Sequence, residues 1–162
     1  MTPGDGLVLA LDQGSHASRA VLFDTAGTEL AQAHVPVATR READDRVEQD
    51  ADELVHSLRT AIQDVCEGRD CARVVAAGLA TQRSTIVAWS RGSGQALTDA
   101  ISWQDRRNAG WLGRLAPVAE QVRGITGLPL SPHYGASKLR WCLDHVPAVQ
   151  RAAAAGDLVL GP

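Results

Sequence analysis

A polar insert lies between two apolar runs near the start of this 162-residue chain, where residues 9–24 read LALDQGSHASRAVLFD. It holds an acid, a glycine, two hydroxyls and an arginine: Asp12, Gly14, Ser15, Ser18 and Arg19. Glycine at a tight bend lets the backbone approach a ligand and leaves N–H groups free to point at an anion. Asp12 is placed to hold a magnesium ion, directly or through water. The pattern predicts a phosphate and magnesium site in a β-hairpin.

The same stretch is equally typical of a plain hairpin turn whose polar residues face water, and the residues alone leave both interpretations open. It differs from a P-loop, because it leads into an apolar run and lacks Gly-Lys-Ser/Thr. Farther along the chain, Gly92–Gly94 lies between two apolar runs and is predicted to be a hairpin turn, with no role in binding nucleotide.

Hydrophobic periodicity predicts the elements that position this insert. Leu7–Leu11 and Ala20–Phe23 read as strands, and Glu29–Thr39 alternates as a third. Short connections between them favour an antiparallel meander. The polar stretch Arg40–Gln49 is predicted to be a surface loop.

A helix is predicted from Asp50 to Gly68, because an acid can cap its start and apolar residues recur on one face. Val74–Ala80 is continuously apolar, as expected of a strand covered on both faces. The remaining predicted elements are strands at Thr85–Trp89, Ala100–Trp103 and Val159–Leu160, and helices at Gln104–Val122 (kinked by Pro117), Ser137–His145 and Pro147–Ala155. Strands that alternate with helices indicate an α/β fold.

Composition excludes several classes of protein. The chain is 44% hydrophobic and 22% charged, which is typical of one globular domain with a real core. A net charge of -3 gives no support to a nucleic-acid partner, and no apolar run is long enough to span a membrane. We expect a cytoplasmic protein whose three cysteines are reduced and structural.

Lys138, on the predicted helix Ser137–His145, is predicted to be a solvated side chain.

Five segments, in register, resemble the FGGY carbohydrate kinases, and their glycerol kinases in particular. They are DQGSHASRA at residues 12–20, VEQD at 47–50, GLATQR at 78–83, ISWQDRR at 101–107, and residues 126–145 with TGLPLSP, SKLRW and LDH. The resemblance covers nearly the whole chain, from residue 7 to residue 161.

This resemblance implies an actin-like, ribonuclease H-like α/β domain. It would contain a mixed sheet (antiparallel meander plus parallel strands) flanked by helices and incomplete at its C-terminus. Such kinases move the γ-phosphoryl group of ATP, with Mg2+, to a hydroxyl of a sugar or polyol. By position, Asp12 would serve the magnesium ion. The residues near the phosphates would be Gly14, Ser15, Ser18 and Arg19.

The resemblance also implies which residues bind the substrate. Arg83 matches the arginine that binds substrate hydroxyls, and Trp103 matches the tryptophan that lines the pocket. Ser84 stands where glycerol kinases carry a glutamate, and His133 where they carry a tyrosine. A small hydroxyl in place of a carboxylate enlarges the pocket and removes a strong hydrogen bond, which argues for a substrate larger than glycerol.

Members of the family are about three times this length, and no residue here matches their catalytic base. We therefore expect residues 1–162 to be the N-terminal domain of a longer kinase, inactive alone and without its second actin-like domain. Its partner would be that C-terminal domain or a further copy of the chain. The alternatives are a non-catalytic binding or assembly module and, more weakly, an actin-like ATPase of the chaperone type. The Arg83 and Trp103 segments argue against this last class, which has no polyol pocket.

Overall fold

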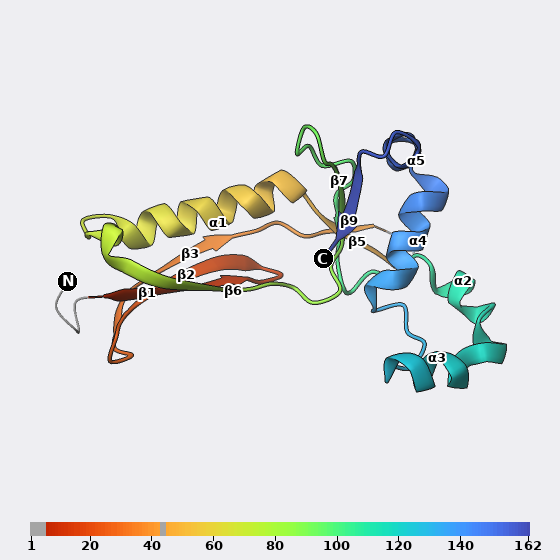
Figure 1. The fold of residues 1–162 in the computed structure, drawn as a ribbon, viewed down its shortest axis with the longest axis horizontal. Coiled ribbons are helices and arrows are strands. Elements are labelled where there is room, and N and C mark those ends of the chain that lie inside the picture. The colour runs from red at the N-terminus through yellow and green to blue at the C-terminus, as the bar shows by residue number, and fades with distance from the viewer. Residues whose placement is uncertain (1–5, 43–44) are drawn as a thin grey trace. The chain divides into compact units, whose positions relative to one another are not determined.

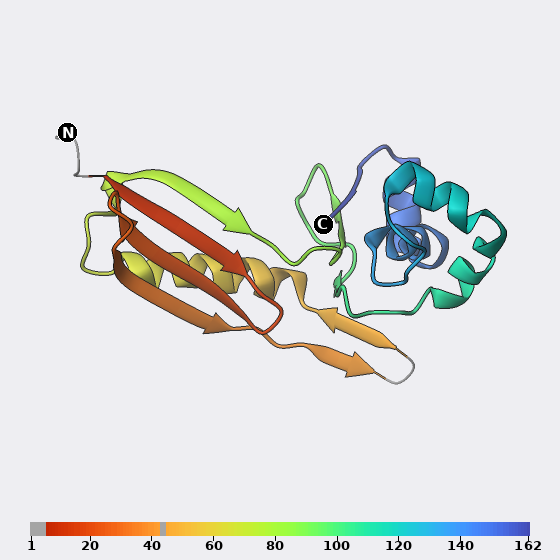
Figure 2. The same ribbon diagram turned by 90° about the horizontal axis from the view of Figure 1, so that it is seen from below.

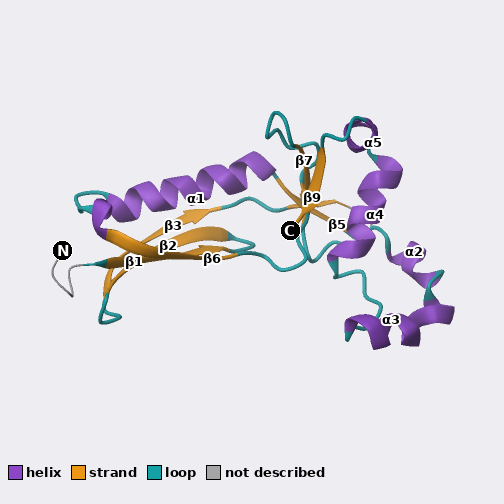
Figure 3. Ribbon diagram, viewed as in Figure 1, coloured by secondary structure: helices purple, strands orange, loops and turns teal. Residues whose placement is uncertain are grey.

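The computed structural model describes residues 6–42 and 45–162. Its strands are β1 (Leu7–Gln13), β2 (Ala17–Asp24), β3 (Glu29–Pro36), β4 (Arg40–Glu42), β5 (Arg46–Gln49), β6 (Val74–Ala80), β7 (Val87–Ser90), β8 (Ala100–Ile101) and β9 (Leu158–Gly161). Its α-helices are α1 (Ala51–Cys66), α2 (Ala109–Gly113), α3 (Ala119–Thr126), α4 (Gly135–His145) and α5 (Pro147–Ala154) (Figures 1 and 3). The chain forms two compact units. The first comprises Met1–Thr39 and Asp52–Gln82, and the second comprises Arg40–Ala51 and Arg83–Pro162.

The first unit is a four-stranded mixed sheet in the order β3-β2-β1-β6. Strands β1, β2 and β3 pair antiparallel, as predicted for a meander, and β6 pairs parallel to β1. Helix α1 lies along one face of this sheet (Figures 1 and 2). The connection that includes α1 therefore returns the chain to the sheet as a parallel strand.

The core of the first unit lies between this helix and this sheet. Leu9 on β1 and Leu22 on β2 point inward because side chains alternate along a strand, and each is nearly fully buried. Ala61 and Val65, four residues apart, present one face of α1 to them. Burying a leucine side chain contributes roughly 1.5–3 kcal/mol, so these contacts hold the strand ends that carry the polar insert.

Strand β6 departs from its prediction. It was expected to be covered on both faces, but its side chains from residue 75 to residue 80 are exposed in the described part of the chain. Val75 is 58% exposed and Leu79 is 55% exposed. An apolar run shows that its residues favour burial, but it does not show which segment buries them.

The cysteines also depart from the expectation of reduced thiols. Cys66, at the end of α1, and Cys71 are joined in a disulfide, with their Cα atoms 5.7 Å apart. Both pack against the core of the first unit. Cys142 is a buried free thiol on α4, and burial raises its pKa to about 11.

In the second unit, the predicted loop at residues 40–49 is instead a hairpin. Strands β4 and β5 pair antiparallel, and β5 also pairs with β8. Residues 43–44 lie outside the described residues. Val47 and Gln49 are buried while their neighbours are not, and this alternation was hidden by the polar composition of the stretch. A second small sheet pairs β7 with β9.

The helices of the second unit partly follow their predictions. Helices α4 and α5 lie where they were expected. The predicted helix over 104–122 instead begins at Ala109 and is divided by a short 3-10 turn, Ala116–Val118, that contains Pro117. Residues 104–108 are not helical, because the carboxylate of Asp105 binds the backbone N–H and the guanidinium of Arg107 there. None of the helices in the described ranges is long and apolar enough to cross a membrane.

Candidate functional site

The polar insert forms the turn between β1 and β2, as predicted. The N–H of Gly14 donates to the carbonyl oxygen of Ala17 at 2.9 Å. A Cβ at Gly14 would lie 2.9 Å from the same oxygen, so the turn needs a glycine at this position. The N–H of Gly14 is thus used inside the turn, which corrects the expectation that it points freely at an anion.

Asp12 and Arg19 lie on the open side of the hairpin. They are directly opposite in the register of β1 and β2, so their side chains share one face of the sheet. Both are exposed. Ser15, in the turn itself, is half-buried, and its carbonyl oxygen accepts a hydrogen bond from Thr39. The hairpin therefore presents an accessible carboxylate beside an accessible guanidinium.

Ser18 differs from its predicted position, because its side chain faces inward. It is fully buried, and its hydroxyl lies 2.8 Å both from Nε2 of Gln13 and from the hydroxyl of Ser57 on α1. Along β2 the side chains alternate, so an outward Arg19 requires an inward Ser18. Ser18 joins the hairpin to α1 through a buried hydrogen bond and does not face the surface where a phosphate would bind.

Gln82 has a role in this hairpin that the sequence did not reveal. Its Nε2 donates to the carbonyl oxygen of Gly14 at 2.9 Å. Both backbone polar groups of Gly14 are therefore engaged, one by the turn and one by Gln82. The signal was present in the segment GLATQR at 78–83, where only the arginine was assigned a role.

The second unit brings together three of the four predicted substrate residues. Nδ1 of His133 lies 3.2 Å from the carbonyl oxygen of Trp103, and their ring centroids are 6.1 Å apart. The backbone N–H of Trp103 donates to the hydroxyl of Thr85 at 3.0 Å. Thr85 directly follows Ser84 in the chain, so this bond brings Ser84 near Trp103. The indole of Trp103 remains accessible, with 38% of the residue exposed. Arg83 is exposed.

Lys138 contacts two residues of this group from the interior of the second unit, which contradicts the expectation of a solvated side chain. The residue is only 1% exposed. Its ammonium donates to the carbonyl oxygen of His133 at 2.7 Å and, more weakly, to that of Ser84 at 3.4 Å. The reason is geometric: the N-terminal end of α4 packs against residues 84–86, so Lys138 on this face points into the unit.

A buried ion network lies next to the same group. The side chain of Asp105 is fully buried and accepts two hydrogen bonds from the Arg107 guanidinium, at 2.9 and 2.7 Å, and one from the N–H of Val47 at 2.7 Å. Glu48 also pairs with Arg107 at 2.7 Å, and the guanidinium lies 4.5 Å from the ring centroid of Trp141. Burial lowers the pKa of Arg107, but its carboxylate partners outweigh this effect and raise the pKa above its ordinary value. The network ties β5 to the turn that carries Trp103.

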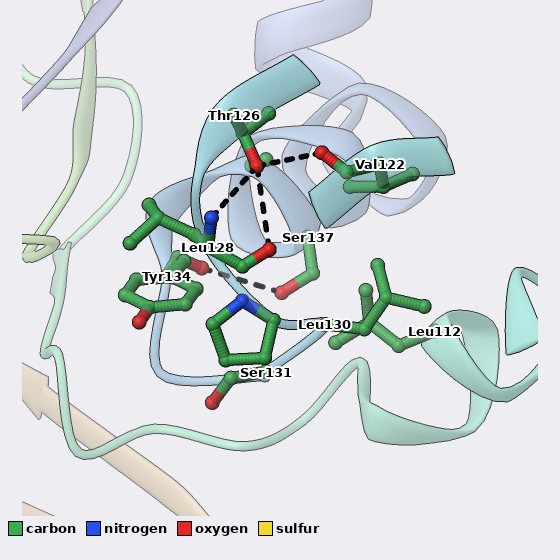
Figure 4. A pocket seen from close by; sticks show the side chains of 10 residues that line it. Leu112, Val122, Thr126, Leu128, Leu130, Ser131, Tyr134 and Ser137 are labelled. Atoms are coloured by element: carbon green, nitrogen blue, oxygen red, sulfur yellow. Dashed lines mark hydrogen bonds between the residues drawn. The ribbon is translucent and has the colours of Figure 1, made fainter. Parts of the chain in front are cut away.

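The second unit also contains a cavity of about 140 Å3, whose lining differs in chemistry from the residues around Trp103. Its lining is mostly apolar and contains no charged residue: Leu112, Val122, Thr126, Leu128, Pro129, Leu130, Ser131, Tyr134, Ala136 and Ser137 (Figure 4). The hydroxyl of Thr126 donates to the carbonyl oxygen of Val122 at 2.8 Å and accepts from the N–H of Leu128 at 3.1 Å. The cavity suits an apolar group, because no charged side chain lines it to bind a phosphate.

Comparisons with known proteins show the family and the fold of this chain. Residues 7–161 match the family described as the FGGY family of carbohydrate kinases, N-terminal domain. A glycerol kinase of Rhodospirillum rubrum is 38% identical over 158 residues, which are 95% of this chain and 32% of that protein. The chain thus spans about a third of the length of the relatives it matches.

Solved structures show the same fold. The glycerol kinase of Plasmodium falciparum with ADP superposes with a TM-score of 0.87 at 19% identity, over 97% of this chain and 32% of that one. The ligand-bound xylulose kinase of Lactobacillus acidophilus superposes with a TM-score of 0.79 at 20% identity, over 86% and 29%. The predicted α/β fold with a mixed sheet is confirmed, and these two kinases share it.

Proposed function

Because the chain belongs to the FGGY family of carbohydrate kinases, as an N-terminal domain, we propose that it supplies two functional surfaces of an ATP-dependent kinase acting on a polyol or sugar. The first is the hairpin at residues 12–19, for the phosphates and their magnesium ion. The second is the group formed by Arg83, Ser84, Trp103 and His133, for the substrate. The complete kinase would be longer, because the relatives extend well beyond the matched segment.

The hairpin has the chemistry that MgATP needs. Magnesium keeps several waters and is commonly held by one or two carboxylates together with the phosphates. Within the hairpin at residues 12–19, the exposed carboxylate of Asp12 would hold the ion, directly or through water. Bound there, magnesium neutralises charge that develops on the transferring phosphoryl group. Arg19 and Ser15 would donate to phosphate oxygens.

The substrate group has the chemistry that a polyol needs. The accessible face of Trp103 can pack on a carbon skeleton, and the guanidinium of Arg83 offers several donors to hydroxyls. The observation that carries the proposal is the convergence of Ser84, Trp103 and His133 from three separate segments of the chain. The base that takes the hydroxyl proton would come from the remainder of the longer protein.

Substrate choice gives the test of this proposal. Glutamate in place of Ser84 restores a charge-assisted hydrogen bond of about 1.5–3 kcal/mol. If half of this energy is recovered, S84E should shift kcat/KM toward glycerol, relative to four- and five-carbon polyols and ketoses, by about tenfold. Ser84 already has a φ of 66°, so a glutamate at this position adopts a backbone conformation that an L-residue already adopts there. The measurement is ADP release by the complete protein on each substrate.

A matched control is S93E, which places the same charge on an exposed turn of the second unit. S93E should leave the ratio of kcat/KM values unchanged. If the unaltered protein already prefers glycerol and S84E only damages it, residue 84 does not face the substrate and the proposed pocket is misplaced.

A further inference from the structure

Lys138 is the single lysine among the 16 basic residues of the chain, and it is buried. Lysine is almost never fully buried unless its ammonium is paired. Here the ammonium has two carbonyl acceptors, on His133 and Ser84, at 2.7 and 3.4 Å. Hydrogen bonds from a charged donor are stronger than neutral ones, and they also fix the positions of the acceptor groups.

The acceptors belong to two of the segments that form the substrate group. Ser84 has a positive φ, a conformation that L-residues rarely adopt, so its carbonyl needs support to stay in place. A Cβ on Gly135 would lie 2.9 Å from Cγ2 of Ile86, which shows how closely the start of α4 approaches the Ser84 segment. His133 in turn contacts Trp103. One ammonium thus connects, directly or through His133, residues 84, 133 and 103.

We propose that Lys138 is the positioning residue of the substrate group: its ammonium holds the carbonyls of Ser84 and His133, and loss of its proton in alkaline solution weakens substrate binding. This inference rests on the proposed function, because the residues it positions are those assigned to the polyol. Lys138 itself need not touch substrate.

The electrostatic surroundings set the pH at which this occurs. Burial lowers the pKa of Lys138 to about 8, because desolvation disfavours the charged ammonium. Asp105 opposes this shift and Arg107 reinforces it. Glu48 on β5 is paired with Arg107, and His133 faces Trp103. Below pH 8 the ammonium is charged and its bonds are strong. Above pH 8 they lose the contribution of the charge, so KM for the polyol should rise.

The first experiment measures how KM depends on pH in the complete protein, over the range in which Lys138 titrates. KM for the polyol, measured from pH 7 to pH 9.5, should rise through about pH 8 in the unaltered protein. K138M removes the ammonium at similar length, so it should raise KM about tenfold at pH 7, change kcat less than about threefold, and abolish the alkaline rise. The KM for ATP should not change. K138R, which keeps its charge over this range, should also lack the alkaline rise.

The matched control is R140M, which removes an exposed cation of the same helix and should leave KM and its pH dependence unchanged. An alkaline rise that persists in K138M, or a KM that K138M leaves unchanged, overturns the proposal. A flat KM profile in the unaltered protein overturns the proton-dependent part without any variant.

Hydrogen exchange separates this inference from the proposed function, because it needs no turnover. K138M should speed exchange at residues 84–86 and 133–135 and leave α5 unchanged. Faster exchange in a protein that phosphorylates no polyol keeps the positioning role and overturns the proposed function. Unchanged exchange at both segments overturns the role of Lys138, whatever the enzyme does.

Discussion

D12N should lower kcat for phosphoryl transfer by about 100-fold or more, while the KM for the polyol stays within about twofold. The amide keeps the size of the side chain but removes the charge that would hold magnesium. Magnesium alignment matters most in the transition state, where charge spreads over the phosphoryl oxygens. The loss should therefore appear in kcat. Steady-state kinetics of the complete protein, with ATP and polyol varied separately, measures both constants.

The structure makes this variant a clean probe. Asp12 is exposed at the end of β1, so the substitution removes no core contact. D64N, on the exposed side of α1 in the same unit, makes the same chemical change and should leave kcat unchanged. A D12N protein with normal kcat would remove Asp12 from the phosphate site and leave the hairpin as an ordinary turn.

D105N should lower the free energy of unfolding of the second unit by about 3–5 kcal/mol, because it leaves the buried Arg107 guanidinium without its main carboxylate partner. The side chains of Asp105 and Arg107 are 0% and 3% exposed, so water cannot reach the guanidinium to solvate it after the carboxylate is lost. Glu48 still pairs with the arginine, which keeps the loss from being larger. Urea unfolding followed by tryptophan fluorescence measures the change, since all four tryptophans of the chain lie in this unit.

The control is D144N, which breaks an ion pair between Arg140 and Asp144 on the surface of α4. Exposed pairs contribute little, so this variant should change the free energy of unfolding by less than about 0.5 kcal/mol. If D105N is as mild as D144N, the buried network does not support the turn that carries Trp103.

The meander was predictable because its information is local. Alternation along residues 7–11, 20–23 and 29–39 specifies which side chains point inward, and short connections specify antiparallel neighbours. The same alternation implies that Ser18 and Arg19 point to opposite faces. Treating both as phosphate donors overlooked this constraint, and the contact between Ser18 and Ser57 shows which one faces inward.

The support of the substrate group was not predictable, because it depends on contacts between distant segments. Lys138 on an isolated helix looks solvated. Only the approach of α4 to residues 84–86, which are about 50 positions earlier, encloses it. The β4–β5 hairpin was missed for a similar reason, since Glu48 and Gln49 pair with β8, about 50 positions later, and the backbone N–H of Val47 donates to the distant Asp105. The resemblance to a family suggested the candidate residues of the site, but it did not indicate which contacts hold them.

The most direct test of the account is the phosphorus NMR spectrum of the complete protein mixed with MgATP, recorded without and then with a polyol or ketose. The account predicts that the γ-phosphate resonance of ATP is stable alone and is replaced, on addition of substrate, by the resonance of a phosphate monoester coupled to a carbon-bound hydrogen. Steady release of inorganic phosphate, independent of any polyol, would instead identify an actin-like ATPase. A spectrum that never changes with any polyol or ketose would contradict the kinase assignment and favour a binding or assembly module.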